Sequence, residues 1–103
     1  MINVIGSLAG EKGYTDSVAY CTSKFGVVGL SEALLQELKE TNTRLILINP
    51  WVVATPMTYT LFPEKSSKAI SPYDIAKMIL FFATEIGDTK YITVSLYGYQ
   101  DFK

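Results

Sequence analysis

The sequence has 103 residues, of which 49% are apolar and 18% are charged, and its formal net charge is −1. These values indicate one globular domain or part of one. They give no excess of positive charge that would favour binding to DNA, RNA or an anionic membrane. The absence of histidine excludes Ser-His-Asp and Cys-His catalysis and every histidine-based metal site. Any chemistry therefore depends on Tyr, Lys, Ser, Thr or carboxylate side chains.

The single cysteine and the short apolar runs bear on the compartment. Cys21 has no partner for an internal disulfide and there is no zinc-type cluster, so we expect a cytoplasmic protein without a bound metal. The longest apolar stretches, Leu45–Ile48 and Met78–Ala83, are far shorter than the roughly 20 residues that span a bilayer. Seven Tyr and five Phe in a short chain suggest that another segment or subunit covers part of the apolar surface.

The first half of the chain predicts a strand followed by a long helix. Met1–Ile5 is a short β-branched run typical of a buried strand, and residues 8 to 16 form a loop by composition. Ser17–Glu40 contains no proline and predicts a helix whose later half carries an apolar stripe of Leu30, Leu34, Leu35 and Leu38. Gly26 and Gly29 each cost up to about 1 kcal/mol in a helix interior. We therefore expect another helix or strand to approach these two glycines closely.

The second half predicts a strand, a helix and a strand. Arg44–Asn49 is the kind of apolar run found in parallel strands covered on both faces, and with the preceding strand and helix it makes a right-handed βαβ unit. Met57–Ile70 is expected to be a mobile loop or short helix. Ser71 starts the next helix as its N-cap, and the buried side of that helix should hold Ile75, Met78, Ile79 and Phe82. Tyr91–Tyr97 predicts the last strand, with Gly98–Lys103 as a tail.

Two Tyr-x-x-x-Lys pairs are candidates for proton-transfer chemistry. Tyr20 and Lys24 are four residues apart on the long predicted helix, so their side chains lie on one face, where an ammonium favours the phenolate form of the tyrosine. Tyr73 and Lys77 have the same spacing, but they lie at the start of a helix with no serine-bearing strand end before it. We interpret this second pair as a solvated surface pair.

Four segments of the chain follow one another in a family-like order and spacing. They are Ile2–Gly10, Tyr20–Leu30, Asn49–Met57 and Ser71–Lys77, with Tyr20 thirteen residues after Ser7. They resemble the serine-bearing strand end, the Tyr-x-x-x-Lys helix, the Asn-Pro-Gly-x-Val-x-Thr-Pro segment and the later helix of the short-chain dehydrogenase/reductase family. The resemblance covers nearly the whole chain.

The resemblance implies an oxidoreductase that uses NAD(P) to reduce a carbonyl, or to oxidise an alcohol, of a small-molecule substrate. Tyr20 would be the general acid for reduction and the base for oxidation, and it would also belong to the cofactor-binding residues. Lys24 would favour the phenolate and hold the nicotinamide ribose, and Ser7 would hydrogen-bond the substrate oxygen. Val53, through its backbone, and Thr55 would hold the nicotinamide carboxamide, in the same cofactor-binding segment as Pro50.

Two departures from the family pattern are visible. The Gly-x-x-x-Gly-x-Gly turn, the Asn-Asn-Ala-Gly segment and the residue that selects NAD or NADP are absent. We therefore expect residues 1–103 to be the C-terminal half of a doubly wound, Rossmann-like α/β parallel sheet, with about three strands and two main helices, lacking the N-terminal dinucleotide-binding half. The isolated chain is expected to be inactive and to bind neither dinucleotide usefully. Trp51 replaces the family's usual glycine, and it either narrows the nicotinamide pocket or points away.

Two functional alternatives remain open from the sequence. The chain is either part of a short-chain oxidoreductase or a self-standing truncated homologue that acts as a non-catalytic association module. In either case we expect a homo-oligomer, most simply a dimer joined through Ser17–Glu40, where Gly26 and Gly29 allow close approach, or through paired edge strands. The substrate is not specified, although Leu61 and Phe62 hint at an apolar ligand.

Overall fold

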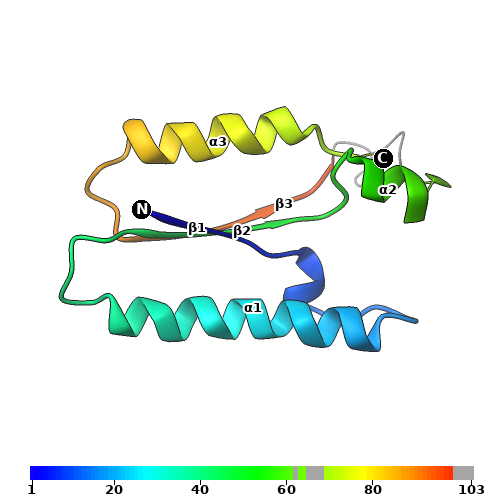
Figure 1. Cartoon of the computed structure of the whole chain (residues 1–103), viewed down its shortest axis with the longest axis horizontal. Coiled ribbons are helices and arrows are strands. Elements are labelled where there is room, and N and C mark those ends of the chain that lie inside the picture. Colours follow the sequence, from blue (N-terminus) through cyan, green and yellow to red (C-terminus); the bar gives the residue numbers. More distant parts are fainter. Residues whose placement is uncertain (62, 65–68, 99–103) are drawn as a thin grey trace.

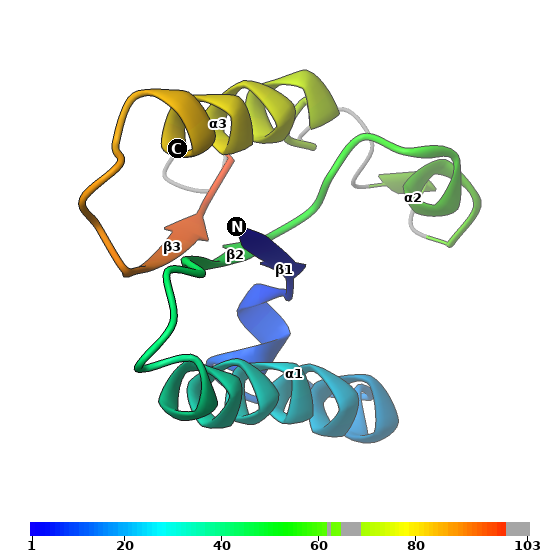
Figure 2. The same ribbon diagram turned by 60° about the vertical axis from the view of Figure 1, so that its left-hand side comes forward.

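The computed structural model describes residues 1–61, 63–64 and 69–98. Its elements follow the order strand, 3-10 helix, helix, strand, helix, helix, strand: β1 (Ile2–Ile5), η1 (Leu8–Gly10), α1 (Val18–Glu37), β2 (Leu45–Pro50), α2 (Pro56–Leu61), α3 (Pro72–Thr84) and β3 (Tyr91–Leu96). Figures 1 and 2 show three layers, with the sheet between α1 on one face and α3 on the other. Phe62, which the sequence suggests as a contact for an apolar ligand, and the part of the predicted tail beyond Gly98 lie outside the described residues.

The sheet is parallel, with strand order β1-β2-β3, so the predicted α/β class is confirmed. β2 is central and all six of its residues are buried, because helices cover both faces of a parallel sheet. Ile46 and Ile48 face α3 and join Ile75 in one core cluster. Since side chains alternate along a strand, Leu45, Leu47 and Asn49 face α1.

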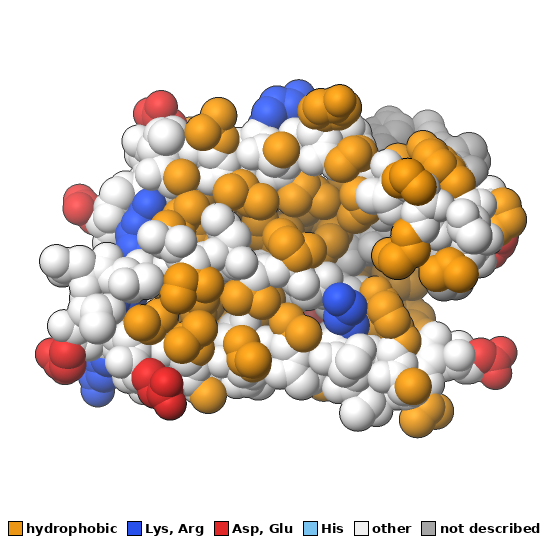
Figure 3. Space-filling view, viewed as in Figure 1, with side chains coloured by type: hydrophobic (Ala, Val, Ile, Leu, Met, Phe, Trp, Pro, Cys, Tyr) orange, Lys and Arg blue, Asp and Glu red, His pale blue; other side chains and the backbone are white. Residues whose placement is uncertain are grey.

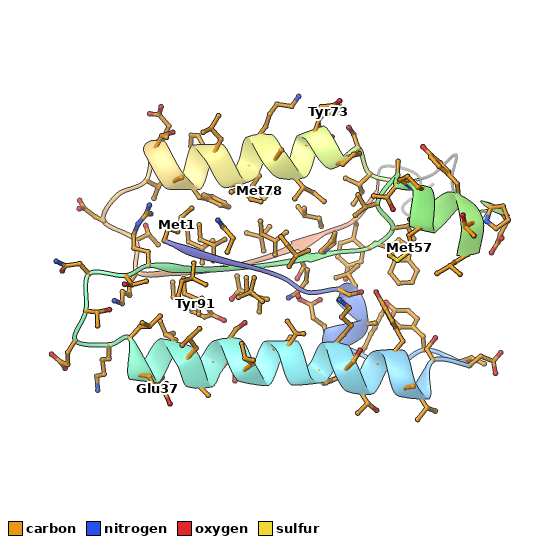
Figure 4. The ribbon with its side chains drawn as sticks, in the orientation of Figure 1. Met1, Glu37, Met57, Tyr73, Met78 and Tyr91 are labelled. Atoms are coloured by element: carbon orange, nitrogen blue, oxygen red, sulfur yellow. The ribbon has the colours of Figure 1, made fainter. Side chains whose placement is uncertain are left out.

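The start of α3 matches the sequence prediction. The Ser71 hydroxyl accepts a hydrogen bond from the Tyr73 N–H at 3.2 Å, and Pro72 occupies the first turn. Ile75 is buried, and the partly buried Met78, Ile79 and Phe82 pack against the same core. Figure 4 shows Met78 between α3 and the sheet and Tyr73 on the outer side of the helix.

α1 differs from its prediction in three ways. It ends at Glu37 instead of Glu40. Leu30 is 57% exposed and so lies outside the apolar stripe, which the half-buried Leu34, Leu35 and Leu38 form alone. Gly26 and Gly29 have nothing within 4 Å of the position of an added Cβ, so no helix or strand of the described chain approaches them. These glycines therefore lie on an open face of the helix.

Two cations close the C-terminal ends of the long helices. The Arg44 guanidinium donates to the carbonyls of Phe82, at 3.0 Å, and of Ile86 and Ala83 at the end of α3. The Lys90 ammonium donates to the carbonyls of Leu38, at 2.8 Å, and Thr41 after α1. Each cation directly precedes a strand and satisfies carbonyls that have no partner within the helix.

The segment after β2 contains a short helix, α2, where the sequence predicted a mobile loop or short helix. The carboxyl ends of the strands, η1, the start of α1 and α2 all lie at the same end of the molecule (Figure 1). In the described part of the chain, no helix is long and apolar enough to cross a membrane. Ligands of open α/β sheets bind outside the carboxyl ends of the strands, so this end holds the candidate site.

Candidate active site

Ser7 begins the turn that follows β1. It is 5% exposed, and its hydroxyl oxygen accepts a hydrogen bond from the Ala9 N–H at 3.1 Å, which caps η1. Because the oxygen accepts this bond, the hydroxyl hydrogen can donate to another oxygen. A Cβ on Gly10 would lie 2.6 Å from the carbonyl oxygen of Lys24, so only glycine allows η1 to pack this closely on α1. The Ser7 turn is therefore held against the part of α1 that carries Lys24.

Tyr20 and Lys24 lie on the first two turns of α1. The Lys24 ammonium is 5.6 Å from the centroid of the Tyr20 ring, within the range of a cation–π contact. Tyr20 is 51% exposed, so its side chain is accessible from solvent. The helical spacing thus brings the two side chains together as the sequence predicts.

The second Tyr-x-x-x-Lys pair has a different setting. Tyr73 is 76% exposed, and the Lys77 ammonium lies 3.6 Å from the carboxylate of Asp74, with both of these side chains largely in solvent. This pair lies on the outer surface of α3, as interpreted from the sequence. It offers a matched control for Tyr20 and Lys24.

The segment from Pro50 to Thr58 leaves β2 and enters α2. Val53 forms a parallel bridge with Ile70. The Ile70 N–H donates to the Val52 carbonyl at 2.7 Å, and the Ala54 N–H donates to the Ile70 carbonyl at 2.8 Å. Because Val52 and Ala54 make the hydrogen bonds of this bridge, the N–H of Val53 points away from Ile70. The Thr55 hydroxyl accepts from the Thr58 N–H at 3.4 Å, while the Thr58 hydroxyl donates to the Val53 carbonyl.

Thr58 is a residue that sequence reasoning missed. Its side chain is 6% exposed and joins Thr55 to Val53. The signal was available in the sequence, because Thr55 before Pro56 is an N-cap pattern that places the third following residue within reach of the cap.

Trp51 stacks on Tyr14 of the loop that follows η1. The ring centroids are 4.9 Å apart with an interplanar angle of 29°, and the Lys12 ammonium lies 5.4 Å from the Tyr14 centroid. The indole therefore joins the loop after β1 to the loop after β2. α2 lies at the same end of the molecule (Figure 1), and Figure 4 labels its Met57 there. This helix also carries Tyr59 and Leu61, and all three side chains are more than half exposed.

The geometry defines an α/β protein with a tyrosine–lysine pair and a buried serine at the carboxyl end of a parallel sheet. The family model described as short chain dehydrogenase matches residues 1–66. This match covers more than half of the chain, and the chain belongs to the short-chain dehydrogenase family.

Three similar proteins illustrate the relationship. The chain is 34% identical to the 3-oxoacyl-[acyl-carrier-protein] reductase FabG of Haemophilus influenzae, over 86% of this chain and 40% of that protein. It superimposes on 4-hydroxyisoleucine dehydrogenase complexed with NADH with a TM-score of 0.74 at 23% identity, over 99% of this chain and 47% of the other. The TM-score is 0.76 at 23% identity for an actinorhodin polyketide ketoreductase variant with NADPH, over 90% of this chain and 44% of the other. The fold is thus part of a Rossmann-like dehydrogenase fold, and the chain spans less than half the length of these proteins.

The prediction that the chain matches only the C-terminal half of the family's fold is wrong. The family model matches residues 1–66, and the structural matches align with the N-terminal part of the family's chains, where nucleotide binding starts. A doubly wound sheet consists of two similar βαβαβ halves, so the order of strands and helices does not distinguish one half from the other. The chemistry of Ser7, Tyr20 and Lys24 therefore rests on their geometry.

Proposed function

We propose that the protein transfers a hydride between a nicotinamide cofactor, NAD or NADP, and the carbonyl or alcohol carbon of a small molecule. The observation that carries this proposal is the position of the Lys24 ammonium over the Tyr20 ring, on the stretch of α1 that packs against the Ser7 turn. Membership of the dehydrogenase family supports the same reaction class.

The nicotinamide, when bound, supplies or accepts the hydride. In the direction of reduction, Tyr20 donates its phenolic proton to the substrate oxygen, so that C=O becomes C–OH and the tyrosine becomes a phenolate. The positive charge of Lys24 stabilises that phenolate, and Ser7 donates a hydrogen bond to the same substrate oxygen as negative charge develops on it. In oxidation the proton returns to Tyr20.

The residues after β2 fit the nicotinamide end of the cofactor. The Val53 N–H, which points away from Ile70, and the hydroxyl of Thr55 are suited to a carboxamide, beside Pro50 at the end of the strand. The sequence has no Gly-x-x-x-Gly-x-Gly turn, and no glycine among the described residues has a positive φ. We therefore expect these 103 residues by themselves to bind a dinucleotide weakly and to be inactive.

We propose a 3-oxoacyl thioester as the substrate to assay first. The relative from Haemophilus influenzae is named for the reduction of a 3-oxoacyl group. In this chain the half-exposed Met57, Tyr59 and Leu61 of α2 would contact an apolar acyl chain next to the site.

The native gene product that carries these residues should oxidise NADH or NADPH when acetoacetyl-CoA is added, and the absorbance of the reduced cofactor measures the rate. Substrate-dependent oxidation supports the proposal. A folded protein that oxidises neither cofactor with this thioester or with simple ketones and aldehydes would favour the non-catalytic association module instead.

We also propose that the chain forms a homo-oligomer through the outer face of α1. Gly26 and Gly29 lie open on this face, between Phe25 and Leu30, which are 47% and 57% exposed. Exposed hydrophobic patches of this kind mark protein interfaces, and small residues let two helices approach closely. Figure 3 shows further hydrophobic side chains gathered in a band between α1 and α3, so the edge of the sheet is the alternative interface.

Sedimentation of the chain at micromolar concentration should give a dimer. Gly29→Arg should shift it to the monomer, because the long charged side chain blocks approach of a second helix. Gly13→Arg is the control, since Gly13 is equally open but lies in a loop outside α1. A monomeric native chain would contradict the proposal, and a dimer unaffected by Gly29→Arg would place the interface elsewhere.

A further inference from the structure

Glu11 connects the turn after β1 to the ends of the other two strands. One oxygen of its carboxylate accepts hydrogen bonds from the Asn49 amide, at 3.4 Å, and from the Ser95 hydroxyl. Asn49 and Ser95 are paired in register on β2 and β3, so their side chains lie next to each other on the face toward α1. Hydrogen bonds to an ionised carboxylate are stronger than those between neutral groups.

The buried side chain of Asn49 donates to Glu11 but leaves its own carbonyl oxygen without a hydrogen bond among the described residues. The side chain is 1% exposed, and the carbonyl oxygen is Oδ1. This oxygen lies 2.3 Å from the position that a Cβ on Gly6 would occupy, so glycine at position 6 makes room for it. A buried acceptor without a partner is unfavourable for folding. In this orientation of the Asn49 side chain, the amide nitrogen points at the Glu11 carboxylate.

Together these contacts hold the Ser7 turn from three sides. The Gly6 N–H bonds the Ile48 carbonyl at 2.8 Å and continues the sheet. Gly10 packs against the Lys24 carbonyl of α1. Glu11 ties the end of the turn to β2 and β3.

We propose that Glu11 is a positioning residue that fixes the Ser7 hydroxyl over the carboxyl end of the sheet. This inference rests on the proposed function, because Ser7 must donate to a substrate oxygen for its position to affect the rate. Glu11 acts through the turn, while Ser7 itself contacts the substrate. A group held in the productive orientation before the reaction lowers the barrier, and a displacement of about 1 Å can cost on the order of 10²-fold in rate.

The first test needs neither cofactor nor substrate. Hydrogen exchange of the Ala9 N–H, which bonds the Ser7 oxygen, is measured by NMR in the full chain. Glu11→Ala should speed this exchange at least about tenfold, since opening of the turn becomes easier. Glu11→Gln should stay close to the native rate, because its amide oxygen still accepts from Asn49 and Ser95. Glu32→Ala, an exposed carboxylate on α1, is the control and should change nothing.

The second test is the split between kcat and KM in the native gene product. Glu11→Ala should lower kcat about tenfold with the KM for cofactor unchanged, and Glu11→Gln should restore most of the rate. If Glu11→Ala does not fold, Ser95→Ala removes one arm of the contact and should give intermediate effects in both tests.

Unchanged exchange at Ala9 in Glu11→Ala would overturn the inference, as would faster exchange with an unchanged kcat. If the native protein reduces no carbonyl, the proposed function fails on its own. The exchange measurement then still decides whether Glu11 holds the turn.

Discussion

In the native gene product that carries these residues, Tyr20→Phe should lower kcat by about 10²-fold or more while the affinity for the cofactor changes little. The substitution removes only the phenolic oxygen, which is the proton donor in the proposed reduction. The ring under the Lys24 ammonium is retained, so the packing at the start of α1 should survive. Steady-state rates with acetoacetyl-CoA, together with a cofactor titration by calorimetry, measure both quantities.

Tyr73→Phe is the matched control, because Tyr73 has the same spacing to a lysine but is 76% exposed on α3. It should leave kcat unchanged. Lys24→Met should weaken both turnover and cofactor binding, since Lys24 is proposed to stabilise the phenolate and to hold the ribose. Native turnover in Tyr20→Phe would rule out this tyrosine as the proton donor.

Arg44→Met should lower the free energy of unfolding by about 2–3 kcal/mol, because hydrogen bonds to charged groups contribute about that much. Arg44 donates to three carbonyls at the end of α3, those of Phe82, Ala83 and Ile86. Methionine keeps the length of the apolar stem but leaves these carbonyls without their donor. Urea unfolding followed by circular dichroism gives the difference.

Lys39→Met serves as the reference for this measurement, since Lys39 is an exposed cation just after α1. It should change the stability by no more than about 0.5 kcal/mol. An equal effect of the two substitutions would show that the contacts at the end of α3 contribute little.

The main elements could be predicted because their signals are local. The run Leu45–Ile48 is apolar at every position, as a strand covered on both faces requires. Ser71 and Pro72 mark the start of α3 through short-range hydrogen bonding and a preset backbone angle. Tyr20 and Lys24 meet because four residues make about one helical turn.

The remaining features depend on contacts between distant segments. The exposure of Leu30 depends on which part of α1 the sheet covers, which a periodic pattern cannot specify. The carboxylate of Glu11 meets Asn49 and Ser95 only after three strands have aligned. The half of the family's fold to which the chain corresponds was predicted wrongly, because that prediction rested on the absence of a glycine-rich turn. The order of strands and helices offered no check on it, since both halves of a doubly wound sheet share that order.

The most direct test of the proposed chemistry is transfer of deuterium to the substrate. NADH or NADPH deuterated at the reactive ring carbon is incubated with acetoacetyl-CoA and the native gene product that carries these residues. Mass spectrometry should then find 3-hydroxybutyryl-CoA with one deuterium at carbon 3, and Tyr20→Phe should form it about 10²-fold more slowly. A folded native protein that forms no deuterated product with either cofactor would contradict the assignment of Ser7, Tyr20 and Lys24 to hydride-transfer chemistry.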